Sequence, residues 1–260
     1  MSANDAVLTR QVAEHVMQVT INRPDARNAV NGDVAQGLER AVFDTEKDPS
    51  IWVVILTGAG DKAFCAGADL KAVSAGTAGG LSTKGGGFGG FVHQPRTKPW
   101  IAAVNGFALA GGTEIALACD LIVAIEDAAF GLPEVKRGLV AGAGGLYRLP
   151  RALPKAIALE LIMTGAHFDA KRAFHYGLVN RLVPRDQLMA EALKLAAAIC
   201  ENAPLAVRAS LGVAKQAYDL DDAALREASG VASRKNAETE DYKEGPRAFI
   251  EKRAPKWAGR

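Results

Sequence analysis

One stretch of the sequence, residues 98–124 (KPWIAAVNGFALAGGTEIALACDLIVA), constrains the fold more than any other. Residues 100–104 and 121–124 are short, uninterrupted apolar runs, which are typical of strands buried on both faces of a parallel sheet. The segment between them is long enough for the crossover that parallel strands require, and an apolar helix is predicted in it over residues 112–119. The stretch therefore predicts an α/β protein.

The rest of the chain extends this pattern and then changes character. Residues 16–21 and 51–57 are predicted strands on either side of an amphipathic helix at 30–46, so we expect a parallel sheet. From residue 156 onward the sequence is mainly helical, with a strand-like break at 178–183. We expect an α/β core over residues 1–200 and a helical region over 201–260 that packs on the body or on a neighbouring subunit.

Composition narrows the classes of function. The 260 residues are 49% hydrophobic, enough for one large core, and the net charge of +2 comes from interleaved acids and bases. We therefore expect neither nucleic-acid binding nor a membrane-binding face. The start of the chain lacks the features of a secretory signal, no apolar run reaches membrane length, and three cysteines form no CxxC pair. This pattern predicts a cytoplasmic protein with reduced thiols.

The central helix carries a single acidic residue in its first turn, Glu114. Such a carboxylate is often only a partner for the helix dipole. However, Gly111 and Gly112 precede it, so backbone N–H groups at the helix start are open to an anionic oxygen. A carboxylate beside exposed amide donors is a candidate catalytic site.

A second segment, residues 62–71 (KAFCAGADLK), repeats the order of strand, small-residue turn and helix start. Ala66, Gly67 and Ala68 leave the backbone of this turn uncovered, and Asp69 is placed to cap the helix. Two such turns from neighbouring crossovers can each donate one N–H to a single oxygen, as the stabilisation of an enolate requires.

Three further features bear on the site. Glu134 follows a proline among apolar residues, where it is either a solvated charge in a turn or a second acid/base group. Residues 73–91 are glycine-rich and without periodicity, which predicts a mobile loop over a binding pocket; their GxGxxG match follows no strand, which disfavours dinucleotide binding. The four histidines form no metal-binding motif, so we expect no catalytic metal.

Five motifs in order resemble the crotonase, or enoyl-CoA hydratase/isomerase, superfamily over nearly the whole chain. They are INRPDARNAV, AFCAGADLK, KPWIAAVNGFALAGGTEIALACD, FGLPEVKRGLVAGAGG and EGPRAFIEKRAPKW. The resemblance implies a spiral of repeated ββα units with a helical C-terminal region that forms homotrimers, or hexamers as dimers of trimers. It also implies an acyl-CoA thioester substrate and no separate cofactor, since coenzyme A is part of that substrate.

The resemblance also assigns residues. It implies that the amides of Ala68 and Gly111 form an oxyanion hole for the thioester carbonyl and that Glu114 and Glu134 are the acid/base pair. Residues implied to approach coenzyme A are Arg27, Ala66 and Lys71, with Lys252 reaching a phosphate across a subunit interface. Ala110 and Ala141 depart from the glycine and proline common in hydratases, and neither departure removes a catalytic group.

The expected activity is enoyl-CoA hydratase: reversible syn addition of water to a trans-2-enoyl-CoA, as in fatty-acid β-oxidation. Segments of the chain also resemble carnitinyl-CoA dehydratases, which makes a polar acyl group an alternative. An isomerase of the same superfamily needs only one base and leaves the second glutamate unexplained. A non-enzymatic RNA-binding homologue predicts a basic face, against the balanced charge.

Overall fold

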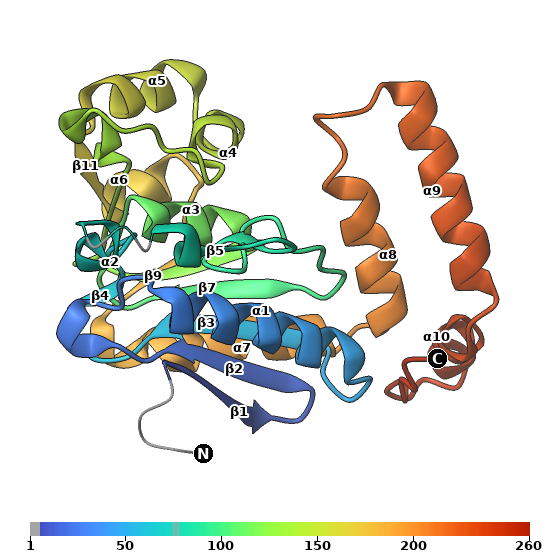
Figure 1. Cartoon of the computed structure of the whole chain (residues 1–260). Helices are drawn as coiled ribbons and strands as arrows, with labels where there is room; N and C mark the ends of the chain where they lie inside the picture. The colour runs from blue at the N-terminus through green and yellow to red at the C-terminus, as the bar shows by residue number, and fades with distance from the viewer. Residues whose placement is uncertain (1–5, 75, 77) are drawn as a thin grey trace.

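A computed structural model describes residues 6–74, 76 and 78–260, and its body is built on two sheets (Figure 1). The larger has the order β1-β2-β3-β7-β9-β12, with bounds Val7–Ala13, Val16–Ile21, Val53–Gly58, Trp100–Val104, Leu121–Ile125 and Arg181–Val183. The smaller has the order β11-β10-β8-β4, with bounds His167–Asp169, Ala129–Gly131, Phe107–Leu109 and Ala63–Cys65. A short hairpin pairs β5 (Ser82–Thr83) with β6 (Gly87–Phe88).

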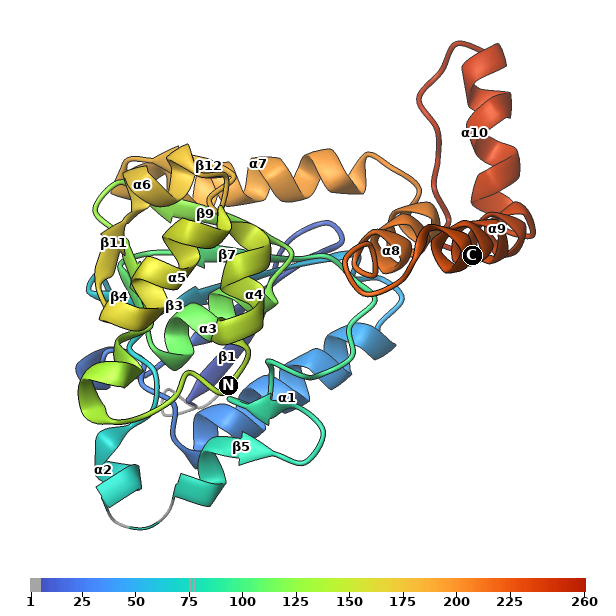
Figure 2. The same cartoon turned by 90° about the horizontal axis from the view of Figure 1, so that it is seen from above.

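Helices cover the sheets and form the C-terminal part. The α-helices are α1 Gly32–Lys47, α2 Leu70–Ser74, α3 Gly111–Ala118, α4 Gly145–Ala152, α5 Lys155–Thr164, α6 Ala170–His175, α7 Leu188–Cys200, α8 Pro204–Ala214, α9 Asp222–Ala237 and α10 Glu240–Ile250. The 3-10 helices are η1 Pro24–Ala26, η2 Ala78–Leu81, η3 Pro133–Arg137 and η4 Arg185–Gln187. Figure 2 shows α7 and α1 on opposite sides of the larger sheet.

The chain is wound as repeated ββα units. The first strands of three successive units, β3, β7 and β9, are parallel neighbours in the larger sheet, and their second strands, β4, β8 and β10, are parallel neighbours in the smaller sheet. Helices α2 and α3 follow β4 and β8. Because consecutive units stack in register, the turns that lead from strand to helix also come to lie side by side. The expected α/β class and spiral of repeats are confirmed.

The core strands follow the sequence pattern. Every residue of β3 and β7 is buried, as their unbroken apolar runs predicted. The expectation of a parallel sheet needs two corrections. In the smaller sheet β11 pairs antiparallel with β10, and in the larger sheet β1 pairs antiparallel with β2 from Val7 opposite Ile21. Only two residues separate β1 from β2, and a hairpin is the connection that so short a link permits. The edge strand β1 is half exposed, and its sequence carries no continuous apolar run.

The last helix and the glycine-rich segment show local features that the sequence did not reveal. Helix α10 begins at Glu240, because the Thr239 side chain accepts a hydrogen bond from the Tyr242 amide and caps it. The glycine-rich segment 73–91 is not wholly irregular, since it contains η2, β5 and β6. Residues 75 and 77, which belong to the predicted mobile loop, lie outside the described residues.

Helices α9 and α10 stand away from the body, as both views show (Figures 1 and 2), whereas Lys215, at the end of α8, forms an ion pair with Asp120 of the body. α8 and α9 pack against each other, and the side chains of Phe249 and Ile250 at the end of α10 are 86% and 78% exposed. The tail is fastened back to α10, because Glu244 accepts hydrogen bonds from Arg253 and the Lys256 amide. Within the described part of the chain, no helix combines the length and apolar character needed to cross a membrane.

Gly112 tests the close packing of the repeats. A Cβ built on Gly112 would lie 1.9 Å from the carbonyl oxygen of Cys65, at the end of β4, so β4 and α3 must separate to admit a methyl group. We expect Gly112→Ala to lower the free energy of unfolding by about 3 kcal/mol in urea titrations. In Gly212→Ala, the matched control on α8, the added Cβ meets no atom within 4 Å, and its stability should rise slightly. Equal stability of Gly112→Ala and the wild type would contradict the packing described.

Candidate active site

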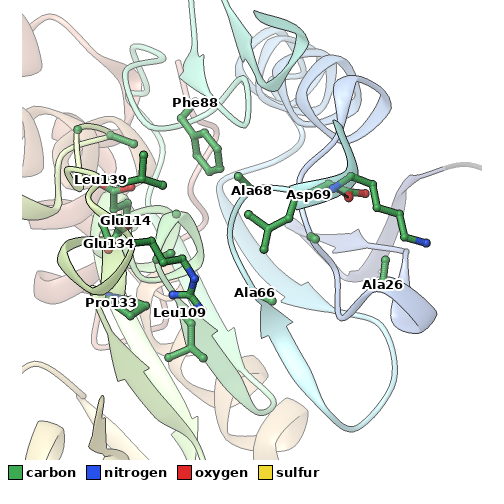
Figure 3. A pocket seen from close by; sticks show the side chains of 18 of the residues that line it. Ala26, Ala66, Ala68, Asp69, Phe88, Leu109, Glu114, Pro133, Glu134 and Leu139 are labelled. Atoms are coloured by element: carbon green, nitrogen blue, oxygen red, sulfur yellow. Dashed lines mark hydrogen bonds between the residues drawn. The ribbon is translucent and has the colours of Figure 1, made fainter. Parts of the chain in front are cut away.

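A pocket of about 810 Å³ opens between the two adjacent turns and the segment around η3 (Figure 3). Six of the residues that the sequence singled out line it: Ala66, Ala68, Lys71, Gly111, Glu114 and Glu134. They come from the turn after β4 and from α2, α3 and η3, so the fold brings together residues far apart in the chain. The remaining two, Arg27 and Lys252, are outside the lining.

Arg27 and Lys252 lie in different places. Arg27 follows η1, whose Asp25 and Ala26 line the pocket, and its carbonyl accepts a hydrogen bond of 3.1 Å from the Ala66 amide. It is therefore a neighbour of the pocket mouth with an exposed side chain. Lys252 follows α10, in the region that stands away from the body. In a single copy of the chain it does not reach the pocket.

The Ala68 amide is directed by the pairing of its neighbours. Val30 forms an isolated parallel bridge with Ala68, in which the Val30 amide donates to Gly67 and the Asp69 amide donates to the Val30 carbonyl. In this pattern the Gly67 carbonyl and the Asp69 N–H bond to Val30. The N–H of Ala68 itself points to the side away from Val30. Asp69 also accepts a hydrogen bond from the Lys71 amide, as expected for a cap.

The Gly111 amide lies beside this turn. Gly111 is the first residue of α3, so its N–H has no carbonyl partner within the helix. A Cβ on Gly67 would lie 3.1 Å from this nitrogen and 2.9 Å from the Ala110 Cβ, so the two turns are in contact. Gly67 also has a φ of +88°, which favours glycine.

A steric reason explains why residue 111 is a glycine. A Cβ at this position would lie 2.3 Å from the ring of Phe88, which hangs over the pocket from β6 (Figure 3). Its φ is not in the left-handed region, so a special backbone conformation does not explain the glycine. The left-handed residue is the preceding one, Ala110, with φ 51° and ψ −125°.

Glu114 is almost completely buried, at 3% exposure, in the first turn of α3. Its Oε1 accepts a hydrogen bond of 2.9 Å from the amide of Gly145, the first residue of α4. Burial raises the pKa of Glu114 to about 7, and the negative charge of Glu134 adds to the increase, while the Gly145 hydrogen bond opposes it.

Glu134 occupies the second position of η3. The sequence left open whether it is a solvated charge in a turn or a second acid/base group. Its Oε2 is buried and has no hydrogen-bond partner among the described residues. Burial raises the pKa of Glu134, while a hydrogen bond from its own backbone N–H and the charge of Arg137 oppose that increase. Two carboxyls that destabilise each other's charged forms tend to hold one proton between them, so the pair can act as one acid and one base.

The lining also contains charged and aromatic residues that were not identified from the sequence, among them Arg23, Phe88, Arg137 and His167. The guanidinium of Arg23 lies 2.9 Å from Asp69 and is fixed further by the Ala29 carbonyl. Arg23 stands inside a quoted motif and Arg137 lies three residues after Glu134, a spacing that offered a signal. Nothing in the sequence pointed to Phe88 or His167, which reach the site through the β5–β6 hairpin and the β10–β11 pair.

No cluster of three or more His, Cys, Asp or Glu side chains suited to a metal ion occurs in the part of the chain that the structure describes. Cys65, Cys119 and Cys200 are free thiols, and burial raises the pKa of each. A thiol with a raised pKa is a poor nucleophile at neutral pH. The ionisable groups available for chemistry in the pocket are therefore the carboxyls and their basic neighbours.

Comparisons with known proteins agree on the family. Residues 11–260 match the family model described as enoyl-CoA hydratase/isomerase. A carnitinyl-CoA dehydratase from Salmonella typhi is 41% identical over 250 residues, which are 94% of this chain and 95% of that protein. The crystal structure of an enoyl-CoA hydratase from Mycobacterium tuberculosis H37Rv superposes with a TM-score of 0.94 at 46% identity, covering 99% of this chain and all of that one. A carnitinyl-CoA hydratase structure from Mycobacterium avium gives 0.77 at 47% identity, with 99% and 100% coverage.

The conformation of Ala110 generates a prediction. A positive φ with this ψ is a region populated almost only by glycine, and an alanine there costs about 1–3 kcal/mol. Replacing Ala110 by glycine removes this strain but adds unfolded-state entropy of about 0.5–1 kcal/mol. We therefore expect Ala110→Gly to raise the free energy of unfolding by about 1 kcal/mol, measured by urea denaturation.

A control variant on the same segment separates the backbone strain at Ala110 from the unfolded-state entropy that a glycine adds. Ala108 lies in β8, is buried and has no positive φ, so Ala108→Gly should destabilise the protein. If Ala110→Gly loses as much stability as Ala108→Gly, the strain assigned to Ala110 is absent.

Proposed function

The chain belongs to the enoyl-CoA hydratase/isomerase family, and from this premise we propose that it catalyses the reversible syn addition of water to a trans-2-enoyl-CoA, giving a 3-hydroxyacyl-CoA. The observation that carries the proposal is the pair of desolvated carboxyls, Glu114 and Glu134, beside two adjoining backbone amides in one pocket. Hydration needs each of these parts: an anion site for the thioester oxygen, a base for water and an acid for the neighbouring carbon.

The amides of Ala68 and Gly111 bind the thioester oxygen. When water attacks C3, electron density moves through the conjugated system and the carbonyl oxygen takes on enolate charge. Two preorganised N–H donors stabilise this charge more than they stabilise the neutral carbonyl, which lowers the barrier. The start of α3 adds positive potential at Gly111.

The carboxyls move the protons. Ionised Glu114, held by the Gly145 amide, accepts a proton from the attacking water as its oxygen bonds to C3. Protonated Glu134 donates a proton to C2, and the two transfers leave the same number of protons on the pair as before. In the reverse direction Glu134 removes the C2 proton and Glu114 protonates the departing hydroxyl.

Coenzyme A is placed along the mouth by the basic side of the pocket. Lys71 and Ala66 line it there and Arg27 stands beside it, as the family resemblance implied. Lys252 lies in the C-terminal region that stands away from the body. It can therefore contact a coenzyme A phosphate only in the pocket of another copy of the chain. We therefore also propose a homotrimer, or a hexamer of two trimers, as the functional assembly.

A second candidate differs in the acyl group and not in the chemistry. Relatives about 41% identical are named carnitinyl-CoA dehydratases. A panel of enoyl-CoA and 3-hydroxyacyl-CoA thioesters that includes carnitinyl-CoA distinguishes the two by their kcat/KM values. An isomerase is less well supported, since it leaves Glu134 or Glu114 without a role.

Glutamine variants test the carboxyl pair. Glu114→Gln and Glu134→Gln retain side-chain size but remove proton transfer, so turnover of an enoyl-CoA should fall by roughly 10²- to 10⁴-fold. Affinity for coenzyme A, measured by calorimetry, should stay near that of the wild type. Glu126→Gln, at an exposed glutamate outside the pocket, is the matched control and should retain full turnover. Full activity in either pocket variant would exclude the two-carboxyl mechanism.

A further inference from the structure

Arg137 shares a helical face with Glu134. Both residues belong to η3, three positions apart, and side chains at that spacing in a 3-10 helix lie one above the other. Both also line the pocket, which fixes the shared face as the one turned toward the substrate site. Glu134 therefore has a cation beside it that is built into its own helix turn.

The Arg137 guanidinium has no competing partner. It forms no ion pair within 4.0 Å and no hydrogen bond with any other described residue, and its side chain is exposed at the mouth of the pocket. Glu134, by contrast, has a buried Oε2 without a hydrogen bond. The backbone N–H of Glu134 itself also lowers the pKa of this carboxyl, but a desolvated oxygen without a donor is costly, and a nearby cation offsets part of that cost.

Other charged groups near Glu134 do not supply this offset. Glu114 on α3 is negative, and Arg148 on α4 acts on Glu114. His167 on β11 is driven toward its neutral form by burial and by Lys136 and Arg137. On α5, which packs against η3, the charged residues are Lys155 and Glu160, and Glu160 pairs with Arg172. Arg137 is the residue whose positive charge acts on Glu134.

We propose that Arg137 is a positioning residue for Glu134, which favours the charged form of the Glu134 carboxyl so that the shared proton of the resting pair resides mainly on Glu114. This is the state from which dehydration starts, and hydration proceeds from the less populated state in which the proton has moved to Glu134. The inference rests on the proposed function, in which one proton is distributed over the two carboxyls. When an acyl-CoA fills the pocket and displaces water, the screening of Arg137 falls and its influence on Glu134 increases.

This assignment has a directional consequence for pH dependence. A bell-shaped kcat/KM profile reports the two macroscopic pKa values of the pair: activity is lost at low pH when both carboxyls are protonated and at high pH when neither is. A cation beside Glu134 favours its ionised form and lowers the lower of the two values. Removing the cation should raise that value and shift the acid limb toward neutral pH.

The experiment compares wild type, Arg137→Leu and Arg137→Lys, with Lys136→Leu as the matched control. Lys136 is the adjacent cation on η3, lies outside the lining and does not act on Glu134. For hydration of an enoyl-CoA between pH 5 and 9, the acid limb of Arg137→Leu should rise by about 0.5–1 pH unit, with the basic limb unchanged. Arg137→Lys should restore the limb, and Lys136→Leu should leave it in place.

Two results would overturn the proposal. An unchanged acid limb in Arg137→Leu would show that Arg137 does not influence the ionisation of Glu134. A raised KM with an unchanged limb assigns Arg137 to binding coenzyme A instead. If the wild type turns over no enoyl-CoA, the proposed function fails separately. A carboxyl ¹³C NMR titration of Glu134, assigned by its loss in Glu134→Gln, then tests the pair without activity: the same midpoint with and without Arg137 contradicts the inference.

Discussion

The contact of Gly67 with Ala110 and Gly111 is the interaction on which the candidate site depends. It holds two strand-to-helix turns together from successive ββα units, and their amides can meet at one oxygen only at this separation. The parallel pairing of β4 with β8 sets the register of the turns, and the absence of a side chain at Gly67 and Gly112 lets them approach. The geometry of the candidate site is thus a consequence of how the repeats stack.

The same stacking places the two carboxyls out of water. Glu114 enters from α3 and Glu134 from η3, which follow the neighbouring strands β8 and β10. Burial raises the pKa of both, and each group around them adjusts that effect: the Gly145 amide opposes it at Glu114 and Arg137 opposes it at Glu134. A shared pocket with unequal stabilisation of the two charges is what acid/base catalysis near neutral pH requires.

Sequence reasoning reached those parts of the fold that local physics determines. The buried strands β3, β7 and β9 were visible as apolar runs, and the helix starts after Gly67 and Gly111 as small-residue turns. Strand β1 was not predicted, because an edge strand exposed on one side carries no such run. Thr239 was not recognised as a helix cap. The pocket positions of Phe88 and His167 depend on contacts distant in the chain, namely the ring of Phe88 against Gly111 and the pairing of His167 with Gly131. Local sequence contains no information about either contact.

The most direct test of the account concerns the N–H of Gly111, whose proposed role involves no side chain. Replacing Gly111 with its 2-hydroxy acid analogue by nonsense suppression converts the amide to an ester, which removes the donor and leaves the space occupied by Phe88 unchanged. Thermal unfolding and coenzyme A affinity report whether the fold and binding survive. If Gly111 is an oxyanion donor, turnover of an enoyl-CoA falls by roughly 10²- to 10³-fold in a folded protein. Turnover close to that of the wild type would contradict the proposal that the two turns converge on the thioester oxygen.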